Sequence, residues 1–116
     1  MSSSSAVVGE LVDVCSALAD DSRWQILQML GDRPLSASEL ASELPISRQA
    51  IARHLGVLEG VGLVEASRHG RQLRYQALGA RLSHVAQHLQ RIGDAWDARL
   101  DRLRVIAEEA AGREGA

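Results

Sequence analysis

The sequence lacks the features that mark secreted and membrane proteins, because its 116 residues include one cysteine and no long apolar run. Cys15 has no second cysteine with which to form an internal disulfide, so nothing in the chain indicates an oxidising compartment. No apolar run approaches the roughly 18 residues of a membrane span, and the serine-rich start lacks the basic and apolar regions of a signal peptide. We therefore expect a cytoplasmic protein without a membrane partner.

Aromatic side chains make up only 3% of the residues, and phenylalanine is absent. A core must therefore be built from leucine, valine, isoleucine and alanine, which favours packed helices over aromatic-rich strands. Hydrophobic residues at 46% and charged residues at 24% exclude a chain that is disordered throughout. The length suits one domain and is too short for a second domain with its own core.

The net charge of −2 is distributed unevenly along the chain. Residues 1–44 carry two arginines against seven acids, residues 45–75 carry five arginines against two acids, and residues 76–116 carry six of each. Attraction to phosphate acts over a distance of about 10 Å, so the local basic excess in the middle segment matters more than the total. That segment is the part of the chain suited to a nucleic-acid partner.

Apolar spacing and capping residues predict helices over the first half of the chain. One helix runs from about Val8 to Leu18. A second runs from about Asp21 to Leu30, with an aspartate as its cap and Gly31 as its end. These two helices supply apolar faces for the core.

A closely spaced pair of helices follows. Ser36 begins a capping-box sequence (SASE), which predicts a short helix over about Ala37–Glu43, and Pro45 prevents its continuation. Ser47 can cap a further helix that ends near residues 60–62. Its inner stripe is formed by Ile51, Leu55 and Leu58. Two helices joined by a turn of about three residues form a helix-turn-helix.

The periodicity changes after this pair of helices. Two strand-like runs, Leu63–Arg68 and Gln72–Leu78, flank Gly70 and predict a β-hairpin. A hairpin directly after a helix-turn-helix is the feature called a wing. The predicted fold class is therefore mainly α with a small β-hairpin, a winged helix-turn-helix that dimerises through its terminal helices.

A long helix is predicted from Arg81 to about Ala110, and Gly93 is the point where it can bend. Its apolar stripe is longer than the rest of so small a domain can cover, so we expect pairing with a second copy. The residues predicted at this dimer interface are Leu11, Val14, Cys15, Leu82, Val85, Leu89, Ile92, Trp96, Leu100 and Leu103. The expected organisation is a disordered tail at 1–7, a DNA-binding core at 8–80, the dimerisation helix at 81–111 and a frayed tail at 112–116.

Three segments resemble the ArsR-type (ArsR/SmtB-like) regulators: LADDSRWQILQML from Leu18, LPISRQAIARHLGVLEGVGLV from Leu44 and RHGRQLRY from Arg68. They are similar to the family's opening motif, its recognition helix and its wing. The W-x-x-R-L-x-x-L pattern from Trp96 resembles a subgroup without the usual metal site. The resemblance implies a homodimeric repressor of an inverted-repeat operator, released by a signal. An unidentified small-molecule effector is one such signal, and no cofactor is expected.

The outward face of the helix after Ser47 is predicted to enter the major groove, where base edges are distinguishable. Gln49 suits adenine, and Arg53 suits guanine or a phosphate. In the wing, Arg68 and Arg71 are expected to approach the backbone or the minor groove. The predicted DNA contacts are Ser36, Ser47, Arg48, Gln49, Ala50, Arg53, His54, Arg68, His69, Arg71 and Arg74.

Other functions compete with this interpretation. His84 and His88 are spaced i, i+4 and can chelate a metal, which would make the protein a metal-responsive repressor, but two histidines alone are too few ligands for a metal site. Cys15 can act as a redox sensor, although a lone cysteine on an apolar helix face is usually a packing residue. No nucleophile motif, phosphate loop or acidic pair predicts an enzyme. A winged protein-interaction module that has lost DNA binding is the remaining alternative, and the basic segment argues against it.

Overall fold

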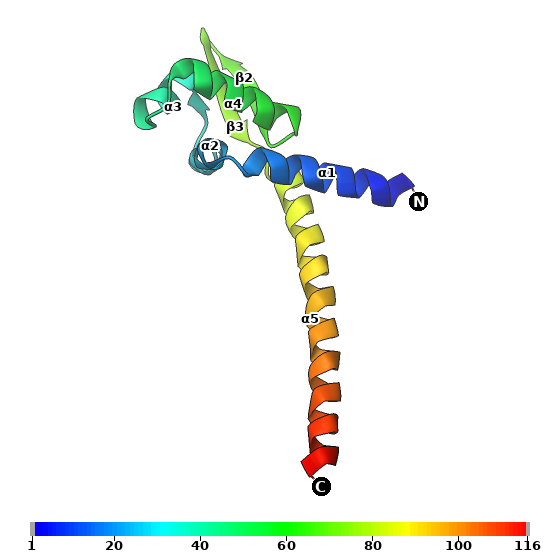
Figure 1. Cartoon of the computed structure of the whole chain (residues 1–116). Coiled ribbons are helices and arrows are strands. Elements are labelled where there is room, and N and C mark those ends of the chain that lie inside the picture. The colour runs from blue at the N-terminus through cyan, green and yellow to red at the C-terminus, as the bar shows by residue number, and fades with distance from the viewer. Residues whose placement is uncertain (1, 116) are drawn as a thin grey trace. The chain divides into compact units, whose positions relative to one another are not determined.

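The computed structural model describes the backbone of residues 2–115 and the side chains of residues 8–113 (Figure 1). Its elements are α1 (Ser2–Leu18), α2 (Asp21–Asp32), β1 (Leu35–Ser36), α3 (Ala37–Glu43), α4 (Arg48–Gly60), β2 (Val64–His69), β3 (Gln72–Ala77) and α5 (Gly79–Gly115). Its contacts divide the chain into two units, Met1–Val85 and Ala86–Ala116. The predicted fold class, mainly helical with a small antiparallel sheet, is confirmed.

The first two helices extend beyond their predicted ends. α1 begins at Ser2 rather than Val8, so the backbone from Ser2 onward is helical where a disordered tail was expected. Adding a residue to a helix that is already nucleated fixes one residue for one further hydrogen bond, so a polar serine tract can continue it. α2 passes through Gly31 and ends at Asp32, because a glycine inside a helix costs only about 1 kcal/mol relative to alanine.

α3 and α4 begin and end close to the predicted residues, because their caps are local. The Ser36 hydroxyl accepts a hydrogen bond from the Glu39 backbone N–H at 3.1 Å, and the Glu39 carboxylate accepts one from the Ser36 N–H at 3.0 Å. This backbone hydrogen bond, followed by one from the serine hydroxyl, lowers the pKa of Glu39 below its usual range. Ser47 caps α4 through the Ala50 N–H at 3.1 Å.

The sheet contains three antiparallel strands in the order β1-β3-β2, one more than the predicted hairpin. Pairing of β2 with β3 runs from Val64 opposite Ala77 to His69 opposite Gln72, which leaves a two-residue turn that begins at Gly70. The φ of Gly70 is +65°, a conformation that favours glycine in such tight turns. The two-residue β1 is too short to leave a period in the sequence.

The core lies in the unit Met1–Val85 and is aliphatic, as the composition predicts. Its fully buried side chains come from α1, α2, β1, α3, α4, the residue before β2 and the first residue of β2: Val14, Ile26, Leu35, Leu40, Ile51, Leu55, Leu58, Leu63 and Val64. Val14 and Val85 are buried in this core at 0% and 4% exposure, so the structure corrects their assignment to a dimer interface. Each lies on the inner side of a helix whose outer side is also partly apolar.

The unit Ala86–Ala116 is the greater part of α5, which is helical without a break at Gly93. An isolated glycine lowers helix stability but does not interrupt a helix with strong helix formers on either side. None of the described side chains of residues 86–113 is buried. Within the described residues, no helix combines the length and the apolar character needed to cross a lipid bilayer.

Candidate nucleic-acid interface

α4 has one buried face and one exposed face. Ile51, Leu55 and Leu58 are each fully buried, and they fix the rotation of the helix against the core. Arg48 and Gln49 in the first turn, and Arg53 between Ile51 and Leu55, are exposed. The structure therefore presents these three predicted readers together on the solvent side of a helix that cannot rotate without exposing its core residues.

The turn between α3 and α4 holds the two helices against each other. Figure 1 shows α3 beside α4, and the two elements are in contact. The backbone N–H of Leu44 closes the end of α3 on the Leu40 carbonyl at 3.0 Å, and the Ile46 N–H bonds to the Leu44 carbonyl at 2.8 Å. Leu44 and Ile46 also pack against the core. This is the geometry of a helix-turn-helix, in which α4 takes the recognition position.

His54 is held by a neighbouring helix. Its Nδ1 lies 3.4 Å from a guanidinium nitrogen of Arg23 on α2, and the Nε of Arg23 donates to the Ala17 carbonyl at 2.5 Å. This contact joins α4 to α2 through two side chains that are distant in the sequence. The His54 side chain is half-buried, so it is less accessible than the exposed readers of α4.

Asp20 completes the contact between α2 and α4. Its carboxylate accepts a hydrogen bond from the Arg23 backbone N–H at 3.1 Å and lies 4.0 Å from the Arg23 guanidinium. The backbone hydrogen bond is the main cause that lowers the pKa of Asp20, with smaller contributions from the charges of Arg23 and His54. Sequence reasoning identified Asp20 only as a helix cap and did not predict the link to His54, because Arg23 and His54 are far apart in the chain.

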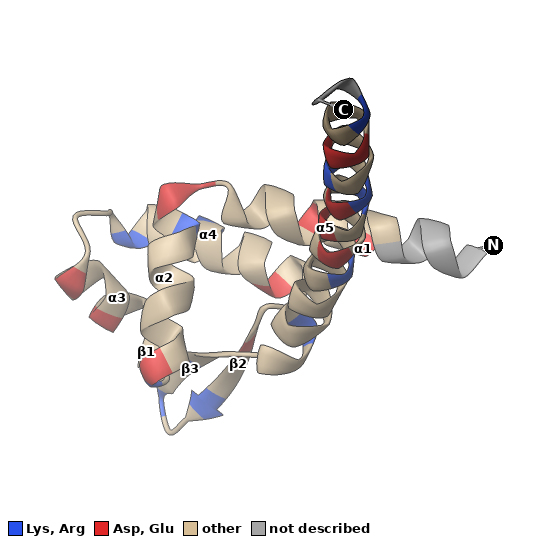
Figure 2. Ribbon diagram, turned by 90° about the horizontal axis from the view of Figure 1, so that it is seen from below, with Lys and Arg blue, Asp and Glu red and all other residues tan. Residues whose placement is uncertain are grey.

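The wing carries basic side chains at its tip. Arg68, His69 and Arg71 are exposed, and Figure 2 shows basic colour near the tip, where no acid lies. The hydroxyl of Ser67 lies 3.0 Å from His69 Nε2. Arg74 is half-buried, and its Nε donates to the Gln72 side chain at 3.1 Å, so it braces the hairpin. The structure therefore separates the predicted wing residues into exposed ones and one bracing residue.

A hollow of about 330 Å³ lies between α4 and the wing. Arg48, the first residue of α4, and Arg71, in the turn of the hairpin, both line it. Gln72 and Tyr75 are further lining residues that the sequence analysis did not assign to the DNA contact. A cationic hollow with hydrogen-bond donors at its rim suits a phosphate of the DNA backbone. Only the fold brings the first turn of α4 next to the tip of the wing.

Ser36 and Ala50 do not belong with the exposed readers. Ser36 is 4% exposed, and its hydroxyl caps α3, with a longer contact of 3.5 Å from the Gln72 amide. Ser36 lines the hollow between α4 and the wing, but its hydroxyl is engaged in the cap of α3, so we expect it to support the fold there rather than to contact DNA directly. Ala50 is half-buried and presents only a methyl group.

The other candidate residues lie away from this face. Cys15 is exposed on α1 and is therefore not a core residue. His84 Nδ1 lies 3.2 Å from the Glu10 carboxylate, which also binds the Arg81 guanidinium at 3.2 Å. Among the residues that the structure describes, no group of three or more histidine, cysteine or acidic side chains is arranged to hold a metal ion. Among the described residues, the structure adds no further candidate ligand to the metal site at His84 and His88 and no second cysteine to Cys15.

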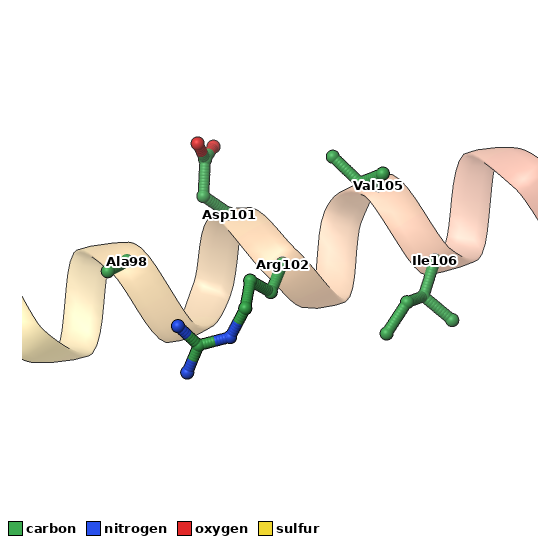
Figure 3. Close-up of a pocket in the computed structure, with 5 residues that line it drawn as sticks. All are labelled: Ala98, Asp101, Arg102, Val105 and Ile106. Carbon is green, nitrogen blue, oxygen red and sulfur yellow. The ribbon is translucent and has the colours of Figure 1, made fainter.

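Most predicted dimer contacts in α5 are exposed. Leu89, Ile92, Trp96, Leu100 and Leu103 are 48–57% exposed, and Leu82 is 38% exposed. Figure 3 shows a stretch of the same helix in which Val105 and Ile106 project from different sides. All five side chains drawn there come from one helix, so no second element encloses the shallow hollow between them.

Comparison with known proteins agrees with this geometry. A family model described as a helix-turn-helix domain matches residues 18–66. The HTH-type transcriptional regulator CmtR of Mycobacterium tuberculosis is 37% identical over 98 residues, which cover 84% of this chain and 80% of CmtR. An ArsR-like transcriptional regulator from Rhodococcus sp. RHA1 is 51% identical, with a TM-score of 0.81 over 88% of this chain and 96% of that one.

One solved relative is described as a homodimer. It is the winged helix-turn-helix DNA-binding domain of a possible ArsR-family transcriptional regulator from Mycobacterium bovis. It is 27% identical to this chain, with a TM-score of 0.64 over 78% of this chain and 83% of that one. The comparisons thus match both the sequence motifs and the arrangement of α4 and the wing.

Proposed function

Because the chain belongs to the ArsR-type family of winged helix-turn-helix transcriptional regulators, we propose that it is a homodimeric repressor that binds an inverted-repeat operator in double-stranded DNA. The observation that carries the proposal is the exposed face of α4 beside the basic wing, with Arg48 and Arg71 across one hollow. DNA-binding regulation follows from the family. The residues, the dimer and the direction of regulation are the proposed part.

α4 is the element suited to the major groove. The groove is about 12 Å wide, and a helix with its side chains is about 10–12 Å across. Gln49 and Arg53 are exposed in the first two turns of α4, so they reach base edges when this end of the helix enters the groove. Arg48 and Arg71 then neutralise a backbone phosphate at the hollow, and Arg68 follows the backbone along the wing.

The dimer is supported by the pattern along α5. Leu82, Leu89, Trp96 and Leu103 follow one another at intervals of seven residues, which is the spacing of a helix that pairs along a seam. The relative from Mycobacterium bovis is described as a homodimer. Two copies related by a two-fold axis present two recognition helices, so the operator is expected to be an inverted repeat with half-sites about 10 bp apart or a multiple of that.

Repression follows when a bound dimer excludes RNA polymerase from the same stretch of promoter, and such a protein acts in the cytoplasm. Deleting the protein should then raise transcription from promoters that carry its operator, as measured by a reporter. A fall in transcription would instead identify an activator and contradict this part of the proposal. The binding site for the reporter comes from mapping the protein on genomic DNA.

Salt-dependent binding to that operator tests the assigned contacts. Arg53→Ala should cost about 1–3 kcal/mol and relax the base preference, because its loss removes a base contact. Arg71→Ala should weaken all sequences about equally and reduce the slope of log K against log salt by about one, because its loss removes a phosphate contact. Arg91→Ala is the control, since this exposed α5 arginine carries the same charge and is not one of the assigned DNA contacts.

The outcomes separate the candidates. If Arg53→Ala and Arg71→Ala match the Arg91→Ala control, the contact face is assigned to the wrong residues. If the wild-type protein binds no genomic DNA at low salt, the winged fold serves protein interaction instead. Unchanged affinity at one of the two positions would confine the error to α4 or to the wing.

A further inference from the structure

A second hollow, of about 300 Å³, lies within the unit Met1–Val85 and is separate from the hollow beside the wing. Its wall is formed by α2, the end of β3 and the first turn of α5. Trp24, Leu27 and Leu82 supply most of the large side chains, and the hollow shares no residue with the one beside the wing. No part of the proposed DNA contact uses it.

The lining of this hollow contains no charged side chain, and its polar side-chain groups are the Gln28 amide and the indole N–H of Trp24. This contrasts with the hollow beside the wing, where Arg48 and Arg71 take part. An ionised ligand would lose its hydration here without gaining a partner, so the lining selects against charge. A neutral, apolar molecule loses no hydrogen bonds on entering and is favoured by the removal of its surface from water.

The size and openness of the hollow limit what can occupy it. An engineered apolar cavity of about 150 Å³ binds benzene, so about 300 Å³ suits a molecule of two rings or a short alkyl chain. A helix from a second copy, about 10 Å across, cannot enter a space of this volume. Gly31 and Gly79 line the hollow, and a Cβ added at either would meet no atom within 4 Å. A Cβ at either of these two lining positions would therefore meet no steric obstacle.

We propose that this hollow binds a neutral apolar small molecule of about two-ring size. Such a molecule would lie between α2 and the start of α5. The adjoining Leu78 N–H bonds to the Leu63 carbonyl at 2.8 Å, directly after the end of α4. The site is thus one short backbone contact away from the exit of the recognition helix, which is a suitable place for an effector of DNA binding.

Titration of the full-length chain with N-phenyl-1-naphthylamine, a neutral fluorophore that brightens in apolar surroundings, tests the proposal. A Trp96→Phe background leaves Trp24 as the single tryptophan, so quenching of its emission reports binding next to the hollow. We expect saturable binding of one probe per chain. The titration contains no DNA, so its result is independent of the operator proposed above.

Two variants with matched controls locate the probe. Gly31→Leu fills the hollow with a better helix former and should weaken binding at least tenfold, whereas Gly56→Leu, at another open helical glycine, should change it less than twofold. Gln28→Glu places a charge in the wall and should weaken binding severalfold, whereas Gln25→Glu, on the same helix but outside the lining, should not. Gln28→Glu decides the question if Gly31→Leu fails to fold.

Three results would overturn the proposal. One is the absence of saturable binding at micromolar probe. Another is equal binding by the wild type and both lining variants. The third is a combined result, in which the wild type binds no probe and Gly31→Leu loses self-association in sedimentation. Side chains of a second copy would then fill the hollow.

Discussion

The two units of the chain use the same aliphatic side chains in opposite ways. Among the described side chains of the unit Met1–Val85, thirteen hydrophobic residues are buried, and nine of them are fully enclosed by their own chain. In residues 86–113 none of the described side chains is buried, although large apolar residues recur there at helical spacing. The periodic signal in the sequence is therefore similar in both units. What differs is whether the chain supplies a surface to cover it.

This difference predicts which property a substitution changes in each unit. Removing a buried side chain in the first unit leaves a cavity and lowers the free energy of unfolding. Removing an exposed apolar side chain in the second unit leaves no cavity within the chain, so its effect must be sought in self-association. Figure 2 shows that α5 carries both acidic and basic residues along its length.

The largest effect is expected in the core. Leu55→Ala removes a fully buried side chain on the inner face of α4 and should lower the free energy of unfolding by about 2–5 kcal/mol in urea denaturation. Leu100→Ala, at a side chain 57% exposed, is the matched control and should cost less than about 1 kcal/mol in the dilute protein. Equal losses of unfolding free energy would show that Leu100 is buried within its own chain. The two units would then not differ in how they cover their apolar residues.

Substitutions on the apolar stripe of the second unit should weaken self-association. Trp96→Glu places a carboxylate on the exposed stripe and should weaken the dimer by about 2 kcal/mol or more, roughly thirtyfold in dissociation constant, because central aromatic residues dominate such interfaces. Leu89→Glu should act in the same direction. Sedimentation over a range of protein concentrations measures both. Gln87→Glu, also exposed on α5, should leave the dimer intact, and stable dimers of both stripe variants would move the interface elsewhere.

A glycine at the exit of the recognition helix should be more sensitive than its neighbour. Gly62 has a φ of +78°, and a Cβ there would lie 2.7 Å from the Arg81 Nε. Gly62→Ala should therefore lower the free energy of unfolding by about 1–3 kcal/mol in thermal or urea denaturation. Gly60→Ala, with open space and a helical backbone, should be neutral or stabilising. Two variants of equal stability would exclude strain at Gly62.

The smallest effect distinguishes a cap from a DNA contact. Ser36→Ala removes the hydroxyl that caps α3 and should cost about 1 kcal/mol of stability while leaving operator affinity unchanged at temperatures where the protein is folded. Thermal unfolding and a binding titration measure the two quantities. Loss of affinity in a fully folded Ser36→Ala protein would return this residue to the interface.

Much of the local structure could be predicted because its causes are local. The capping box at Ser36 and the cap at Ser47 set the starts of α3 and α4, and the hairpin turns at Gly70 as expected. The exposed face of α4 also follows from the spacing of its buried residues. These features depend on hydrogen bonds or periods within a few residues, so the amino-acid order contains them directly.

Other features could not be predicted, because they join distant residues. Val14 and Val85 have the same pattern as interface residues, and only the packing of the first unit shows that they are buried. The contact between Arg23 and His54, and the shared hollow of Arg48 and Arg71, connect separate elements of the fold. The short β1 strand exists only because β3 lies beside it.

The sequence by itself determined the helix caps, the turn at Gly70, the basic middle segment and the apolar stripes. The tertiary structure decided which stripe is covered by its own chain, which polar groups remain exposed beside the wing, and that a hollow without charge lies between α2 and α5. The physical reason is that hydrogen bonding within a turn depends on neighbours in the chain, whereas burial depends on which surfaces meet in space.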